Sequence, residues 1–341
     1  MKTIVRLADV ARHAGVSIPT VSRILNGVQT VAPELKERVM KSVEELGYQP
    51  NRMAKSLREQ RTGILAHLTA GLNANFHSTL ARGVQDAAFD LGYTMILGSS
   101  HHLDVAQGQL TYAKLFDSYR VDGMVVVPPG TSDPYLETLA SRIPIIEVDR
   151  TVGDYSRHAV LLNNAEVMAD AVRHLISLGH KHIALLYGIE LVSTEVERYQ
   201  GFLHTMKDCG VPVDPRLLIS DDFTEEGGHR AFQRLVNSNL PVTAVVVTTN
   251  EMLAGVVGCA RQMGVKIPDD ISLIGMDDER WVRMMTPSLT VMAQAPYEMG
   301  YEACRLLIQC VEGQNGDTPW QLRIPGKLVV RESTAPPRSS G

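Results

Sequence analysis

The sequence predicts an α/β protein that joins a small all-α helix-turn-helix headpiece to a two-lobed body of doubly wound parallel sheets. Three observations support this fold class. The first sixty residues contain three short amphipathic periodicities, and from about residue 62 buried β-rich runs alternate with helical stretches. This alternation occurs in two successive series, which indicates two parallel sheets, each covered by helices on both faces. A length of 341 residues is enough for two or three domains.

The headpiece begins with a helix expected at 7–14, where apolar residues recur at the spacing of one helical face. Gly15 suits the left-handed conformation that ends a helix. Ser17 is expected to cap a second helix, which closes at Asn26-Gly27, and a third helix is expected from about Pro33 to Leu46. Two short helices joined by a tight glycine-containing turn predict a helix-turn-helix.

The exposed face of the second helix carries the chemistry of this module. Arg23 can donate two hydrogen bonds to a guanine, and Ser22 can reach a phosphate or a base. Ile18 and Pro19 offer only apolar contact, for example to a thymine methyl group. These side chains favour DNA binding, although three helices of this size could also be a simple packing module.

The charge distribution separates the headpiece from the body. Residues 1–61 contain 11 Lys and Arg and 6 Asp and Glu, whereas the other 280 residues contain 22 and 32, so the overall net charge of −5 hides a basic module. Such asymmetry indicates nucleic-acid binding by the N-terminal part, and chance clustering on solvated helix faces is the alternative. The segment 51–58 that follows is too short for an isolated helix, so it is expected to fold only when docked.

In the body, strands and helices are expected to alternate. The strands are expected at 64–69, 93–98, 122–128, 143–149, 182–188, 217–220, 243–249 and 271–277. The helices are expected at 76–91, 105–118, 164–178, 195–209, 225–237 and 251–263. Ligands of such folds bind outside the carboxyl ends of the strands, which in a two-lobed body is the cleft between the lobes.

The candidate ligand-binding residues are side chains that follow the predicted strands, together with Arg198 early in a helix and Phe76 before the first helix of the body. They combine carboxylates, guanidinium groups and amides with one aromatic ring: Phe76, Asp149, Arg150, Arg198, Asn250, Asp277 and Gln294. Such a set can hydrogen-bond neighbouring hydroxyl groups and stack on a ring face, so a sugar is the expected ligand class. The alternative is that the strand-end aspartates cap the following helices.

Two N-terminal segments resemble the headpiece and hinge of the LacI/GalR family of bacterial transcription regulators: DVARHAGVSIPTVSR (9–23) and LGYQPNRMAKSL (46–57). Four segments of the body match blocks of the same family: LGHKHIALLYG, ERYQGF, IPDDISLIGMDD and TPSLTVMAQ. The resemblance implies a periplasmic-binding-protein-like body, a homodimer and a leucine wedge in the minor groove at Leu57. Family position also implies a DNA-binding set, and it places Arg198, Asp277, Asn250 and Asp149 in the effector pocket with Phe76 and Gln294 close by. The DNA-binding set is Ser17, Ile18, Pro19, Thr20, Ser22, Arg23, Asn26, Tyr48, Asn51, Arg52, Lys55, Leu57 and Arg58.

Three positions depart from the family pattern. Arg6 stands where a Thr or Ser often caps the first helix, and Ala32-Pro33 replaces the usual capping Ser of the third, so both caps are expected to be slightly weaker. Asn250 is followed by Glu251 where the family has Asp, which makes the role of Asn250 less secure. The resemblance covers the chain from the headpiece to about residue 335.

These observations predict a ligand-controlled repressor in which residues 1–49 form the headpiece and 50–61 the hinge. The body is expected at 62–335, with an N-lobe at about 62–162 and 293–320, a C-lobe at about 163–292 and 321–335, and a flexible tail at 336–341. A stand-alone cytoplasmic sugar-binding protein and a regulator with a purine-type corepressor are the alternatives. The effector, the operator and the choice between dimer and tetramer stay open.

Sequence motifs, apolar runs and cysteine spacing argue against an enzyme, a membrane protein and a secreted protein. There is no phosphate loop, dinucleotide fingerprint or hydrolase motif, so neither an enzyme nor a cofactor or metal site is expected. No run of about 18 apolar residues and no signal-peptide core is present. The four cysteines form no Cys-x-x-Cys pair, which is typical of a cytoplasmic protein with reduced thiols, here associated with the nucleoid through DNA.

Overall fold

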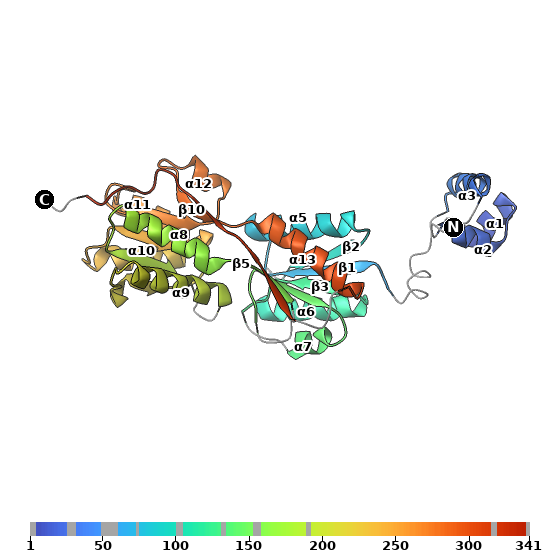
Figure 1. Cartoon of the computed structure of the whole chain (residues 1–341), viewed down its shortest axis with the longest axis horizontal. Helices are drawn as coiled ribbons and strands as arrows, with labels where there is room; N and C mark the ends of the chain where they lie inside the picture. Colours follow the sequence, from blue (N-terminus) through green and yellow to red (C-terminus); the bar gives the residue numbers. More distant parts are fainter. Residues whose placement is uncertain are drawn as a thin grey trace. The chain divides into compact units, whose positions relative to one another are not determined.

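A computed structural model describes residues 5–25, 32–48, 61–72, 75–99, 105–130, 134–152, 158–188, 192–314 and 319–338. The chain divides into two compact units, a headpiece within Met1–Thr62 and a body that comprises Gly63–Gly341 (Figure 1).

The headpiece consists of helices α1 (Leu7–Ala14), α2 (Ile18–Leu25) and α3 (Pro33–Leu46). Gly15 ends α1 at φ 63°, and the Ser17 hydroxyl accepts a hydrogen bond from the Thr20 amide at 3.3 Å, as expected for the cap of α2. The helices enclose a small apolar core made of Val10, Ala11, Ala14, Val21, Ile24 and Val39. The sequence periodicity therefore placed all three helices and their inward faces correctly.

The caps of α1 and α3 are the two residues expected from the sequence, Arg6 and Ala32. Neither Arg6 nor Ala32 makes a side-chain cap hydrogen bond. At α1 the carboxylate of Asp9 accepts a hydrogen bond from the Arg6 amide at 2.9 Å, and Pro33 occupies the first turn of α3, where no amide is needed.

The N-lobe of the body is a six-stranded sheet in the order β11-β5-β4-β3-β1-β2, and all of its strand pairs are parallel. Its strands are β1 (Ile64–Thr69), β2 (Thr94–Ser99), β3 (Gly123–Val126), β4 (Ile145–Val148), β5 (His158–Leu162) and β11 (Trp320–Ile324). Its helices are α5 (Asn75–Asp90), α6 (Val105–Ser118), α7 (Pro134–Ala140) and α13 (Pro296–Val311). Helices α5 and α13 lie side by side on one face of the sheet, and α6 and α7 cover the other (Figure 1).

The C-lobe repeats this topology with the order β12-β10-β9-β8-β6-β7, in which β12 alone is antiparallel to its neighbour. Its strands are β6 (Ile183–Tyr187), β7 (Leu218–Ser220), β8 (Ala244–Val247), β9 (Ser272–Met276), β10 (Thr290–Ala293) and β12 (Lys327–Val329). Its helices are α8 (Asn164–Ser177), α9 (Ser193–Asp208), α10 (Glu225–Asn237), α11 (Asn250–Met263) and α12 (Arg280–Met284), with a 3₁₀ turn at Pro215–Leu217.

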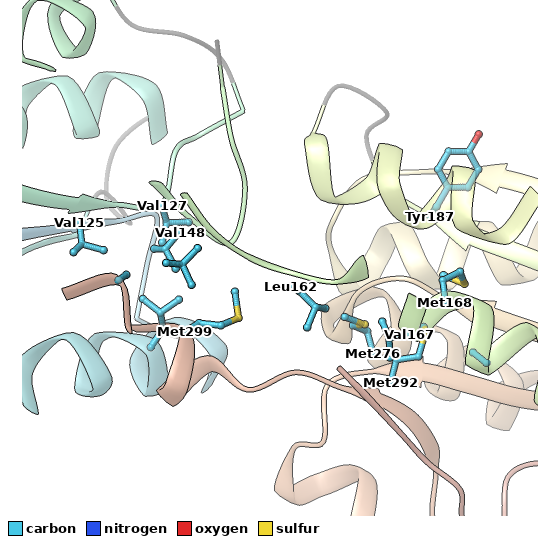
Figure 2. Close-up of a cluster of buried hydrophobic side chains, with 14 of the residues drawn as sticks. Val125, Val127, Val148, Leu162, Val167, Met168, Tyr187, Met276, Met292 and Met299 are labelled. Atoms are coloured by element: carbon cyan, nitrogen blue, oxygen red, sulfur yellow. The ribbon is translucent and has the colours of Figure 1, made fainter. Parts of the chain in front are cut away.

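Alternate residues of each buried strand serve different cores, because side chains point to opposite faces of a sheet in turn. In β8, Val246 packs with α8 and α9, whereas Val245 and Val247 pack with α10 and α11. One cluster of buried apolar side chains contains residues of both lobes. In Figure 2, Leu162 at the end of β5 lies between N-lobe side chains such as Val148 and C-lobe side chains such as Met276. The lobes therefore share apolar packing where the chain passes from β5 to α8.

Several boundaries differ from the sequence prediction. Strand β11 pairs with β5, so residues 320–324 belong to the N-lobe sheet, and the lobe boundary expected near residue 320 lies too early. Arg338 forms ion pairs with Asp269 and Asp270, so the segment expected to be a flexible tail is anchored as far as this residue. The elements β5, β11, β12, α7, α12 and α13 were not predicted from the sequence.

Candidate functional site

A cavity of about 550 Å³ lies in the body, where residues from the carboxyl ends of strands of both lobes meet. All seven predicted ligand-binding residues line it. The sequence reading missed the other ten lining residues, or did not assign them to the pocket: Ala70, Gly71, His77, Thr194, Glu195, Phe223, Thr224, Thr249, Glu251 and Glu279. Two of these lie three residues beyond a strand, Phe223 after β7 and Glu279 after β9, so extending the strand-end rule by a few residues could have found them.

The two strand-end aspartates share an unusual backbone conformation. Asp149 after β4 has φ 73° and Asp277 after β9 has φ 70°, in the left-handed region where few residues other than glycine are found. Each backbone amide donates to the next strand, Asp149 to Val160 and Asp277 to Met292, which fixes the residue at the pocket. Neither aspartate caps a helix: the next helix after Asp149 is α8, whose cap is Asn163, and the next after Asp277 is α12, whose cap is Glu279. The capping alternative for these aspartates is therefore wrong.

Arg198 lies at the bottom of the cavity and is 5 % exposed. Its Nη1 donates to Glu195 Oε1 at 3.1 Å and to the Thr248 carbonyl at 2.8 Å, and its Nε donates to Asn164 Oδ1 at 2.8 Å. Glu195 is 1 % exposed and also accepts a hydrogen bond from the Gly188 amide. This network holds a buried ion pair in one orientation and leaves Nη2 of Arg198 without a hydrogen bond to any described residue.

The other arginine of the pocket is also paired. Arg150 donates through Nε to Asp149 Oδ2 at 2.9 Å, and the Asp149 side chain is 4 % exposed. Both arginines that were expected to bind ligand therefore already have a carboxylate partner.

Asp277 has no such cationic partner among the described residues. Its Oδ1 accepts a hydrogen bond from Gln294 Nε2 at 2.9 Å. Burial raises the pKa of Asp277 to about 7, with contributions from Glu251 and Glu279, against the lowering effects of Gln294 and Arg198. The pKa of Glu279 is also raised, by burial and then by Glu251, although its carboxylate accepts a hydrogen bond from the backbone amide of Asn75.

Two histidines of the N-lobe lie at or beneath the same cavity. His77 lines the cavity and contacts the Thr69 hydroxyl through Nδ1 at 3.3 Å. His67 is fully buried, with Nδ1 at 3.1 Å from the Val125 carbonyl. Burial lowers the pKa of both imidazoles to about 4, so neither adds positive charge to the pocket at neutral pH.

Aromatic rings come from both lobes. Phe76 belongs to α5 of the N-lobe, and Phe223 follows β7 of the C-lobe. Phe223 lies against Gly188 at the end of β6, where an added Cβ atom would be only 2.0 Å from the Phe223 ring. A glycine is therefore required at this strand end for the ring to reach its place.

Asn250 is the first residue of α11, and its Oδ1 accepts a hydrogen bond from the Trp281 indole at 3.2 Å. This contact leaves its amide NH₂ group, which can donate to a ligand oxygen. Glu251 is exposed at the pocket wall, and the cap of α11 remains with Thr249, so the longer carboxylate has not moved the cap.

The described DNA-binding candidates lie mainly on the exposed face of α2. Ile18 is 48 % exposed, and Ser17, Pro19 and Arg23 are exposed as well, whereas Ser22 is half-buried. Thr20 is half-buried, with its hydroxyl 2.8 Å from that of Ser17, and Tyr48 packs against the headpiece core. The remaining candidates lie outside the described residues: Asn26, Asn51, Arg52, Lys55, Leu57 and Arg58.

Among the residues that the structure describes, no helix is long and apolar enough to span a membrane. Within the same residues, no three carboxylate, imidazole or thiol groups are placed as a metal ion would need.

A headpiece of three helices, followed by a two-lobed body with a polar cavity, defines the class of ligand-responsive DNA-binding regulators. Comparison with known proteins agrees with this class. Residues 6–51 match the model described as bacterial regulatory proteins, lacI family, and residues 172–334 match a periplasmic binding protein-like domain.

Relatives of similar length support the same conclusion. Catabolite control protein A of Priestia megaterium is 30 % identical over 332 residues, which cover 97 % of this chain and 99 % of that protein. The chain therefore belongs to the LacI family and is a DNA-binding transcriptional regulator.

Two solved structures have the same architecture along almost the whole chain. The lac repressor dimer bound to operator and an anti-inducer has a TM-score of 0.83 at 24 % identity, covering 98 % of this chain and all of that one. The transcriptional regulator CelR in complex with cellobiose has a TM-score of 0.74 at 28 % identity, covering 96 % and 99 %.

Proposed function

We propose that this regulator is a repressor whose affinity for operator DNA is controlled by a sugar-class effector bound in the cavity between the lobes. The observation that carries this proposal is that all seven residues selected from the sequence line one cavity, although they span positions 76 to 294. Their carboxylate, amide and guanidinium groups can hydrogen-bond hydroxyl groups, and Phe76 and Phe223 can stack on a sugar ring. The CelR–cellobiose complex, which has the same fold, supports a sugar ligand.

The DNA-bound form is a homodimer that places two α2 helices in successive major grooves of a pseudo-palindromic operator. Arg23 reads a base, and the hinge at 50–61 carries Leu57 to the minor groove as a wedge. In this proposal residues 1–49 are the headpiece and 62–335 the sensing body of a cytoplasmic protein that binds its effector without catalysis. Effector binding lowers operator affinity through a coupling free energy of about 1–3 kcal/mol.

A gel shift on the DNA upstream of its own gene, with and without a panel of sugars and purine bases, tests the proposal. A sugar that weakens the complex supports repression relieved by an inducer. A purine base that strengthens the complex would replace this proposal with corepression. Asp277→Ala should abolish the response to the ligand while the complex with DNA still forms, and a normal response in this variant would remove the cavity from the mechanism.

Variants of the headpiece test DNA recognition separately. Arg23→Ala should lose discrimination at one base position of each half-site, and an unchanged operator preference would remove Arg23 from base readout. Leu57→Gly should weaken operator binding far more than non-specific binding, whereas equal losses on both DNAs would refute the wedge.

A further inference from the structure

The charged side chains of the cavity are not balanced. Five of the lining residues are acidic, whereas only Arg150 and Arg198 carry a positive charge. His77 stays neutral at pH 7, because burial lowers its pKa to about 4. The cavity therefore has more negative than positive side chains.

Two ion pairs neutralise part of this negative charge, and the carboxylates that remain all lie on one side of the cavity. Arg150 is paired with Asp149 in the N-lobe, and Arg198 is paired with Glu195 in the C-lobe. These two pairs cancel their own charges and leave Glu251, Asp277 and Glu279. Among the residues that the structure describes, these three carboxylates form no ion pair, and all of them come from the C-lobe side of the cavity.

The three carboxylates are close enough to repel one another. Besides burial, Glu251 and Glu279 both raise the pKa of Asp277, against a lowering effect of Arg198, and Glu251 adds to the effect of burial on the pKa of Glu279. Like charges in a partly desolvated cavity destabilise the empty protein, and a positive charge placed among them removes this repulsion. A neutral sugar would leave the repulsion in place, and a sugar phosphate would increase it.

A metal ion does not suit this arrangement, since the described carboxylates are not grouped closely enough to chelate one. A cavity of about 550 Å³ has room for an organic molecule, and the remaining wall suits a polyol. The amide of Asn250 can hydrogen-bond hydroxyl groups, and the rings of Phe76 and Phe223 can pack against C–H groups of a pyranose.

We propose that the effector is an amino sugar, whose ammonium group binds among Glu251, Asp277 and Glu279 while its hydroxyl groups and ring face contact the rest of the cavity. This inference rests on the proposed effector role of the cavity and specifies the chemical class of the ligand. It excludes phosphorylated and other anionic sugars as effectors, because no unpaired cation lies among the described lining residues.

The test measures binding to the full-length protein by calorimetry and thermal shift with matched ligands. Glucosamine, galactosamine and mannosamine are each compared with the neutral parent sugar, the N-acetyl derivative and the 6-phosphate. At least one amine should bind at least about tenfold more tightly than its three uncharged or anionic counterparts, the effect of one charge-assisted hydrogen bond. The Glu251→Gln/Glu279→Gln variant should lose this preference.

Glu298→Gln is the matched control, because it removes one exposed carboxylate of α13 outside the cavity and should keep the preference for the amine. The inference is overturned if a parent sugar or a 6-phosphate binds as tightly as the amine. It is equally overturned if no amine shifts the melting temperature at about 50 mM, since that concentration stabilises even a site of millimolar Kd.

The operator gel shift separates this inference from the proposed function. If a neutral sugar binds the protein and causes it to release the operator, the proposed function stands and the amino-sugar inference is refuted. An amino sugar that binds with the expected preference but leaves operator affinity unchanged would support the ligand class and refute the regulatory role of the cavity.

Discussion

The two lobes of the body are built on the same strand order, yet the N-lobe contributes a neutral ion pair to the cavity between them and the C-lobe contributes an excess of carboxylates. In both lobes an aspartate in the left-handed conformation follows the fourth strand of the lobe along the chain, β4 or β9, and donates its amide to the next strand. In the N-lobe this aspartate pairs with Arg150, whereas in the C-lobe it accepts a hydrogen bond from Gln294, forms no ion pair with a described residue, and lies near Arg198 and two acidic side chains. A shared backbone therefore fixes where a side chain stands, and the neighbouring residues decide its charge state.

The largest difference between the lobes is expected for their two ion pairs. Arg198→Ala should lower the free energy of unfolding by about 3–5 kcal/mol, because it leaves the carboxylate of Glu195 buried without a cation. Arg150→Ala should cost much less, since the Arg150 side chain is 24 % exposed and water can replace it. Urea unfolding of both variants measures the contrast.

A second substitution checks the cause of the Arg198 effect. Glu195→Gln in the Arg198→Ala background should recover part of the lost stability, because it removes the unpaired buried charge. The explanation is wrong if Arg198→Ala and Arg150→Ala lower the free energy of unfolding equally. It is also wrong if Glu195→Gln restores no stability to Arg198→Ala.

The unpaired aspartate of the C-lobe should make stability depend on pH. The pKa of Asp277 is about 7 in the folded protein and 3.8 in an exposed chain, so the folded state binds the proton more tightly. Stability is therefore highest below about pH 4 for this group and falls as the pH rises towards 7. Asp277→Asn keeps the left-handed backbone and removes this loss, on the order of a few kcal/mol.

Thermal unfolding of Asp277→Asn and the wild type between pH 4 and pH 8 measures this effect. The advantage of the variant should grow with pH and level off above about pH 7. Asp170→Asn, a control at a half-exposed carboxylate of α8, should change the melting temperature little at any pH. A constant difference between Asp277→Asn and wild type would contradict the raised pKa.

The aromatic wall of the C-lobe depends on one glycine. Gly188→Ala places a Cβ atom 2.0 Å from Cε1 of Phe223, so the ring must move, at a cost of about 1–3 kcal/mol. Ala70 follows β1 in the N-lobe as Gly188 follows β6, and Ala70→Gly should cost about 1 kcal/mol or less. The melting temperatures of the two variants compare the two strand ends. Equal decreases would show that the position of the Phe223 ring does not require a glycine at residue 188.

The smallest expected effect concerns the helix cap at the C-lobe wall. The Thr249 hydroxyl accepts a hydrogen bond from the Met252 amide at 3.3 Å, and Thr249→Ala should cost about 1 kcal/mol. Thr249→Ser keeps the hydroxyl and should retain nearly full stability. If both variants unfold at the same temperature, the cap does not stabilise this wall of the cavity.

Much of the site followed from the sequence because strand ends are visible as local patterns. A buried run such as IPIIEV predicts a strand whether or not its neighbours are known, and the residue after it faces the carboxyl edge of the sheet. The same rule did not select Phe223, which lies three residues beyond the end of β7, and it missed Glu195, which lies on α9 rather than after a strand. Its burial depends on contacts with Thr248, 53 positions along the chain.

The sequence by itself determined the helix-turn-helix, the alternation of strands and helices, and the residues that reach the pocket edge, because periodicity and capping act within a few residues. Only the tertiary structure decided which charges are neutralised. Whether Arg150, Arg198 or no cation lies beside a given carboxylate depends on the sheet order and on the passage of the chain between lobes at β5, β10 and β11. Electrostatic energy depends on distance in space, which a linear pattern does not contain.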